Sequence, residues 1–143
     1  MKQILLLAAI TLIALTSCGS RGNKKTSENT KAETTAQVSN PSTVYVYYFH
    51  GKQRCKTCIA VGNVSEKAVK DMYADNPNVR FIEVQTDDEA NAALVEKYEV
   101  TWNALIIAKG DENIEITKQA FASAINNPDT LTDLIKTEVD KRL

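Results

Sequence analysis

The pattern of hydrophobic and polar positions divides the chain into three segments. Residues 4–15 are apolar except for Thr11, residues 19–42 are polar with little apolar content, and residues 43–143 contain regularly spaced apolar positions. The polar segment cannot bury enough surface to fold, so we expect a flexible tether in front of one folded domain. The length of 143 residues leaves room for a single ordinary domain.

The apolar pattern of residues 43–143 predicts alternating strands and helices. Runs rich in β-branched and aromatic residues predict strands, and apolar residues at spacings of three and four predict helices. The first strand is apolar on both faces, so we expect it at the centre of its sheet. The expected elements, in chain order, are a strand at 43–49, a helix from 58 to about 74, a strand at 79–85, a short helix capped by 86–89, a strand at 104–108, a strand at 113–118 that forms a hairpin with it, and a last helix opened by 127–129. This βαβαββα order predicts an α/β fold with a four-stranded mixed sheet flanked by helices.

Residues 1–17 have the features of a lipoprotein signal peptide. A cationic start precedes an apolar stretch far shorter than the roughly 20 residues that span a bilayer. The following Leu15-Thr16-Ser17-Cys18 resembles the lipobox of bacterial lipoproteins, which implies that the Cys18 thiol accepts a lipid and that the mature protein starts there. The alternative is an ordinary signal peptide followed by a free cysteine. Residues 18–42 are then the lipidated cysteine and its tether, and residues 43–143 are the domain.

The expected location is the cell envelope. Gly19 is not the aspartate that holds lipoproteins at the inner membrane in enteric bacteria, so we expect the outer membrane, with the domain facing the periplasm. The chain carries 17 basic and 18 acidic residues, which leaves no basic excess to neutralise phosphates. Nucleic acid is therefore excluded as an expected partner, and the oligomeric state stays open.

Cys55-Lys56-Thr57-Cys58 is the motif that carries chemistry. It lies between a buried strand and the start of a helix, the context that gives a C-x-x-C motif its redox meaning. The helix N-terminus favours an anion, and Lys52, Arg54 and Lys56 place three positive charges around the first thiol. We therefore expect Cys55 to attack and Cys58 to resolve, with a redox partner protein in the envelope.

The element order with C-x-x-C after the first strand resembles the thioredoxin fold over essentially all of residues 43–143. The fuller string from Tyr47 to Cys58, behind a lipobox and a polar tether, is similar to small exported thioredoxin-like proteins described as a nitrophenyl-compound nitroreductase subunit of the ArsF type. Nitro reduction normally uses a flavin or a metal centre, and the chain has no flavin-binding segment. We expect no cofactor, and a role in such chemistry would be to pass electrons. The stabilised thiolate predicts a reduction potential above that of thioredoxin.

The sequence departs from the thioredoxin pattern at two places. Thioredoxins carry a cis-proline before the third strand, whereas the matching stretch here is 100–105 (VTWNAL), so we expect trans peptide bonds. Thioredoxins also bury an acid six residues before the first cysteine, where this chain has Phe49, or Tyr48 if the loop shifts the match. Glu83 is a candidate replacement base for Cys58, or a solvated or structural residue.

Three alternatives to redox exchange stay open. His50, the only histidine, could join Cys55 and Cys58 as ligands for a soft ion such as Cu(I) or for Zn, which would make the chain a metal carrier. The cysteines could instead form a structural disulfide, and the domain could be a scaffold. Trp102 is expected opposite the motif, either as packing or as a platform for a substrate.

Overall fold

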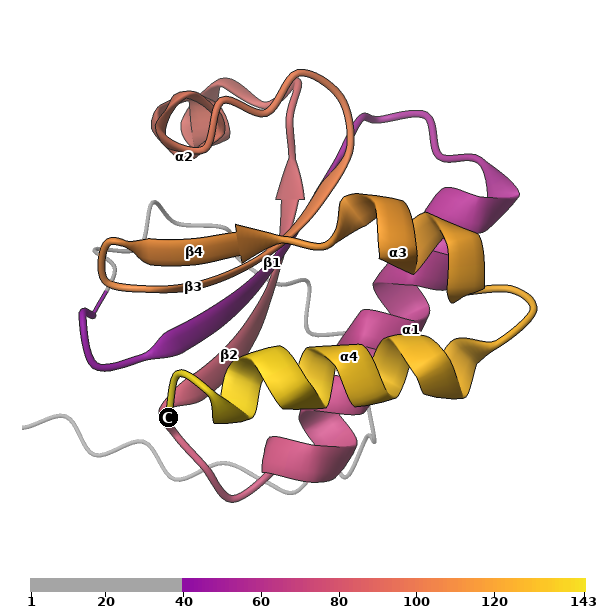
Figure 1. Ribbon diagram of the computed structural model, residues 1–143. Coiled ribbons are helices and arrows are strands. Elements are labelled where there is room, and N and C mark those ends of the chain that lie inside the picture. Colours follow the sequence, from indigo (N-terminus) through magenta and orange to yellow (C-terminus); the bar gives the residue numbers. More distant parts are fainter. Residues whose placement is uncertain (1–39) are drawn as a thin grey trace, which may run out of the picture. The chain divides into compact units, whose positions relative to one another are not determined.

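Strand β1 (Val44–His50) is the centre of the fold, and all seven of its residues are buried. The computed structural model describes residues 40–143 (Figure 1). β2 (Val79–Gln85) pairs with β1 in parallel, while β3 (Ala104–Lys109) pairs with its other edge antiparallel. β4 (Glu112–Glu115) completes the sheet as the antiparallel neighbour of β3, in the order β2-β1-β3-β4. The predicted α/β class with a four-stranded mixed sheet flanked by helices is confirmed.

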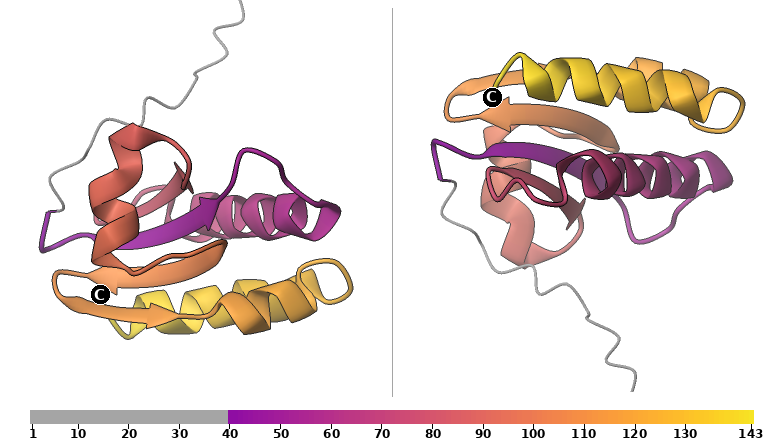
Figure 2. Two further views of the ribbon diagram at one scale, coloured as in Figure 1. Left: turned by 90° about the horizontal axis from the view of Figure 1, so that it is seen from above. Right: turned by 90° about the horizontal axis from the view of Figure 1, so that it is seen from below.

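Helices cover both faces of this sheet. The structure has α1 (Lys56–Tyr73), the 3-10 turn η1 (Glu89–Asn91), α2 (Ala92–Lys97), α3 (Thr117–Ser123) and α4 (Pro128–Asp140). Figure 2 shows α2 on one side of the strands and α4 on the other. Helices α1, α3 and α4 contact one another and supply the residues of the larger core, whereas α2 packs on a smaller aromatic core.

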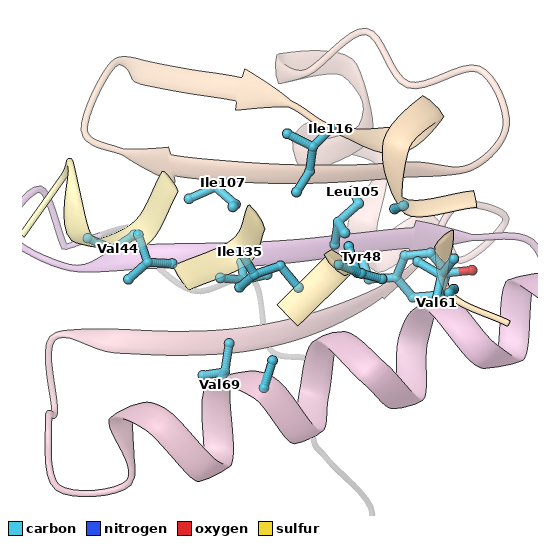
Figure 3. Close-up of a cluster of buried hydrophobic side chains, with 14 of the residues drawn as sticks. Val44, Tyr48, Val61, Val69, Leu105, Ile107, Ile116 and Ile135 are labelled. Carbon is cyan, nitrogen blue, oxygen red and sulfur yellow. The ribbon is translucent and has the colours of Figure 1, made fainter. Parts of the chain in front are cut away.

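The alternation of side chains along β1 creates these two cores, since successive residues of a strand point to opposite faces. Val44, Val46 and Tyr48 join the core beneath α1 and α4, and Figure 3 shows Tyr48 among its neighbours there. Tyr45, Tyr47 and Phe49 join the core beneath α2. Because both faces of β1 are covered, its continuous apolar run is explained, as the sequence predicted.

The predicted strand at 113–118 is wrong in its second half. β4 ends at Glu115, and α3 begins at Thr117, where the sequence pattern had indicated no helix. Ile116 is fully buried, its amide donates to the Leu105 carbonyl at 2.9 Å, and the Thr117 hydroxyl accepts from the Leu105 amide at 2.9 Å. These two bonds to β3 anchor the end of the hairpin, and the chain turns from there into α3.

The last turn of α4 is held by ion pairs and by the end of β3. Glu138 is buried and lies 2.6 Å from Lys141 Nζ and 2.8 Å from Arg142 Nη1. Hydrogen bonds from Lys141 and Arg142 lower the pKa of Glu138 below its usual range. Lys109 Nζ donates to the Arg142 carbonyl, which joins the end of β3 to the end of the chain.

The predicted signal peptide at 1–17, Cys18 and most of the tether lie outside the described residues. Within residues 40–143, no helix is both long enough and apolar enough to cross a membrane.

Candidate functional site

Cys55 and Cys58 form a disulfide at the start of α1, with their Cα atoms 5.0 Å apart. Cys55 is the N-cap residue of α1, with extended backbone angles, and its sulfur accepts a hydrogen bond from the Cys58 amide at 3.2 Å. Cys55 is exposed, whereas Cys58 lies one turn inside the helix and is buried. The helix begins at Lys56, two residues earlier than the sequence pattern indicated, because Cys55 itself caps it.

The position of Cys55 favours a negative charge on its sulfur. The first amides of a helix lack partners within the helix, and they carry the positive end of the helix dipole. The first turn of α1 holds no acidic side chain that would oppose this effect. An exposed sulfur at such a place is where a reactive thiolate is expected once the disulfide is reduced.

The disulfide opens onto a groove with a volume of about 1040 Å³. The groove lies where β1 and β2 end and β3 begins, and its walls come from three loops and from α1 and α3. Beside the two cysteines, Lys52, Thr86, Trp102 and Phe121 line it. The side chain of Trp102 is 79% exposed, so this ring is a wall of the groove rather than part of a core. All peptide bonds of residues 40–143 are trans, as expected for the loop that holds Trp102.

Tyr48 occupies the place beneath the motif. The β1 alternation directs Tyr48 to the face of α1 and Phe49 to the opposite face, so Tyr48 is the residue that lies on the side of the motif. The buried Tyr48 hydroxyl donates to the Cys58 carbonyl at 2.7 Å. Burial raises the pKa of Tyr48, although the neighbouring Arg54 opposes this effect. A neutral hydroxyl therefore lies against the first turn of α1, bonded to the backbone of the second cysteine.

The three predicted cations have different surroundings. Lys52 and Lys56 are exposed, and of these two Lys52 lines the groove. Arg54 is folded against the domain, where its Nη1 lies 2.6 Å from Glu83 Oε1 and its guanidinium lies over the Tyr48 ring, 5.4 Å from the centroid. The positive charge predicted at Arg54 is therefore paired with a carboxylate, and its effect on Cys55 depends on that pair.

The alternative metal site with His50 is not formed among residues 40–143. His50 is buried, its Nε2 lies 3.4 Å from Glu83 Oε1, and its Nδ1 donates to the Gly51 carbonyl at 2.8 Å. Among the described residues, no group of three or more His, Cys, Asp or Glu side chains is placed to hold a metal ion. The His50 ring lies 5.6 Å from the Tyr48 ring, and its polar contacts are with Glu83 and the Gly51 carbonyl. Glu83 contacts Arg54 and His50 rather than either sulfur.

Gly62 is the site residue that the sequence interpretation missed. It had appeared only as a weak point of the first helix, but a Cβ at this position would lie 2.5 Å from Arg54 Nη2 and 3.1 Å from the Tyr48 ring. The glycine thus creates a notch in α1 that holds the guanidinium. A glycine on the strand-facing side of an amphipathic helix was the available signal, since it costs about 1 kcal/mol of helix stability relative to alanine.

Comparison with known proteins gives no named relative. No family model matches the chain, and no curated protein matches it. Among solved structures, the chain is similar to one described as "Structure of a malarial protein", at 24% identity over 68% of this chain and 98% of that chain, with a TM-score of 0.47. A likeness at this level does not indicate a function.

Proposed function

We propose that the chain is a thiol-disulfide oxidoreductase of the cell envelope, in which Cys55 attacks and Cys58 resolves. The observation that carries the proposal is the disulfide itself, with one sulfur exposed at a helix N-cap and the other buried one turn inside. This asymmetry suits an exchange reaction, because a partner protein must reach the first sulfur, whereas the second sulfur needs to reach only the first one. A structural disulfide needs neither an exposed N-cap sulfur nor a groove beside it.

The proposed reaction begins with the reduced pair. The Cys55 thiolate attacks one sulfur of a partner disulfide, an S–S bond forms between the two proteins, and the other partner sulfur leaves as a thiolate. Cys58 then loses its proton and attacks the Cys55 sulfur, so that the Cys55–Cys58 disulfide forms and the second partner sulfur leaves. The partner gains two electrons and the two leaving thiolates take up protons. The reverse sequence oxidises a partner dithiol.

Further support comes from the element order and the resemblance. The observed order matches the expected βαβαββα, with α3 added before the last helix, and the motif follows β1 as in a thioredoxin-like domain. Thioredoxin-likeness and a relation to the nitroreductase subunits of the ArsF type stay part of this proposal. In such a system the domain would pass electrons, because its proposed chemistry resides in two sulfurs.

The test of the proposal is a redox titration of the purified domain, with the dithiol fraction measured by alkylation and mass. We expect a reversible two-electron transition between about −120 and −270 mV, the range of thiol-disulfide oxidoreductases. A midpoint below about −300 mV would indicate a structural disulfide. Cys58→Ser should accumulate a mixed disulfide with a partner protein, whereas Cys55→Ser should not.

The anchor at Cys18 is the second part of the proposal, and it rests on the lipobox-like sequence. The full chain should partition with membranes and carry a lipid on Cys18, as measured by fractionation and mass of the mature N-terminus. Cys18→Ala should abolish the lipid while leaving the redox transition unchanged. Recovery of an unlipidated full chain from the soluble fraction of its host would refute the anchor alone.

A further inference from the structure

We infer that Arg54 and Glu83 are positioning residues that set the equilibrium between the dithiol and the disulfide, with opposite effects. The inference rests on the proposed function, which supplies the exchange reaction, but it concerns residues that do not exchange. In the described part of the chain, neither side chain forms a hydrogen bond or an ion pair with a sulfur. They act instead through the charge that they place beneath the first turn of α1.

Arg54 is fixed by four contacts. Its Nη1 pairs with Glu83 at 2.6 Å, its guanidinium lies over Tyr48, its Nη2 lies 3.5 Å from the Cys58 carbonyl, and Gly62 leaves the space that the Nη2 atom occupies. A residue next to Cys55 in sequence is thus turned back toward β1 and α1. The cation is held in one position relative to both cysteines, all of which line the same groove.

This cation is only partly compensated. Its Nε is buried without a hydrogen-bond partner in the described part of the chain, so that part of the guanidinium is desolvated. Glu83, which neutralises it, is 42% exposed and shares its carboxylate with His50. Of the other charged groups near the motif, Lys52 and Asp87 line the groove and Lys56 follows Cys55 in sequence; all three are exposed and so are screened by solvent. The Arg54–Glu83 pair is therefore the main fixed charge pair beside the motif.

A charge at this place acts on one redox state more than on the other. The disulfide is neutral, whereas the reduced pair can carry a thiolate, so a nearby cation stabilises the reduced form and a nearby carboxylate destabilises it. With glutathione, one protein disulfide and two glutathione thiols give one protein dithiol and one glutathione disulfide. Removing the cation should shift this equilibrium toward the protein disulfide, and removing the carboxylate should shift it toward the dithiol.

The experiment measures that equilibrium constant for Arg54→Gln and Glu83→Gln at one pH and salt concentration. Arg80→Gln is the matched control, because Arg80 is an exposed cation on β2 far from the motif in the strand register. We expect at least about a threefold shift for each site variant, in opposite directions, from the loss of a partly buried unit charge. The control should stay at the wild-type value. Equal directions, or shifts no larger than that of the control, would overturn the inference.

Gly62→Ala provides a variant that keeps every charge. The added methyl would meet Arg54 Nη2, so it should displace the guanidinium and shift the equilibrium in the same direction as Arg54→Gln. If Arg54→Gln does not fold, as judged by circular dichroism, Gly62→Ala and Glu83→Gln decide the question by their opposite shifts. An unchanged equilibrium in folded Gly62→Ala would contradict the assigned position of Arg54.

A second readout separates this inference from the proposed function. The pH at which the Cys55 thiolate forms can be followed by ultraviolet absorbance in the reduced protein, whether or not the pair exchanges with glutathione. We expect thiolate formation at higher pH in Arg54→Gln and at lower pH in Glu83→Gln. If the pair does not exchange with glutathione but the two variants show these opposite pH shifts, the proposed function alone is refuted. Normal exchange without them would refute the inference alone.

Discussion

Replacing Cys55 by serine or by alanine should separate its chemistry from its role as a helix cap. Both variants remove the disulfide and leave Cys58 as the remaining cysteine of the motif. They differ in whether the side chain at the N-cap can accept the hydrogen bond that the Cys55 sulfur accepts from the Cys58 amide at 3.2 Å. The serine hydroxyl can replace that acceptor, whereas alanine leaves the amide unpaired.

The expected difference follows from this single bond. Exchange of an N-cap serine for alanine costs about 1 kcal/mol, with a range of about 0.5–2 kcal/mol. We therefore expect Cys55→Ala to be about 1 kcal/mol less stable than Cys55→Ser, which corresponds to about 4–8 °C in melting temperature for a domain of this size. The buried residues of α1 keep the helix docked in both variants, so neither should unfold at room temperature.

Urea denaturation with excess reductant measures this difference, using circular dichroism and equal m-values as the check that both unfold alike. Both variants should lack any redox transition. If the two variants are equally stable, Cys55 does not cap α1 in the absence of the disulfide. The argument that the helix amides stabilise a thiolate at Cys55 would then fail as well.

Further predictions concern the core, the end of α4 and the groove. Ile135→Ala should lower the free energy of unfolding, measured in urea, by about 2–5 kcal/mol because Ile135 is fully buried. The control Ile125→Ala, at a position 45% exposed, should change it by no more than about 0.5 kcal/mol. Equal losses would contradict the core assignment. Glu138→Gln should destabilise the domain at neutral pH, because the lowered pKa of Glu138 contributes stability that is present above its unfolded pKa of about 4.3 and is lost as the pH falls through the folded value. The difference in urea midpoint between this variant and the wild type should narrow as the pH falls below about 4.3, and a difference that does not narrow would contradict the ion-pair explanation. Trp102→Ala should leave the urea midpoint unchanged, because the ring is exposed. It should slow disulfide exchange with a protein partner more than exchange with glutathione, because the ring lines the groove. Equal slowing with both would argue against a contact between Trp102 and the partner.

The fold was largely predictable because its elements have strong local patterns. β2 has the predicted bounds, and β1 is buried on both faces as its continuous apolar run indicated. Helix α3 was missed because its buried positions are the small residues Ala120 and Ser123, which give little hydrophobic periodicity. Its start depends on Thr117 bonding to β3, a contact that arises only in the folded hairpin.

The site was predictable at the cysteines and not around them. The spacing of Cys55 and Cys58 before an amphipathic helix was sufficient to predict an exposed N-cap sulfur and a buried partner. The pairing of Arg54 with Glu83 depends on the register between β1 and β2, which places Glu83 beside Tyr48. Periodicity predicts that two strands exist but does not set which of their residues are neighbours. The surroundings of His50 depend on the same register, which brings its Nε2 near Glu83.

The hydrogen bond from Lys109 to the Arg142 carbonyl places the C-terminal residues at the end of the sheet opposite the groove. β3 runs antiparallel to β1, so Lys109 lies near the beginning of β1, and Arg142, which follows α4, lies there too. The described chain also enters at this end, where the Asn40 amide donates to the Tyr45 hydroxyl. The groove is at the other end of β1, about 20 Å away for a strand of this length. A domain coupled to a bead or a sensor surface through either end should therefore expose its disulfide to the solution, and immobilised protein should capture macromolecular partners without obstruction.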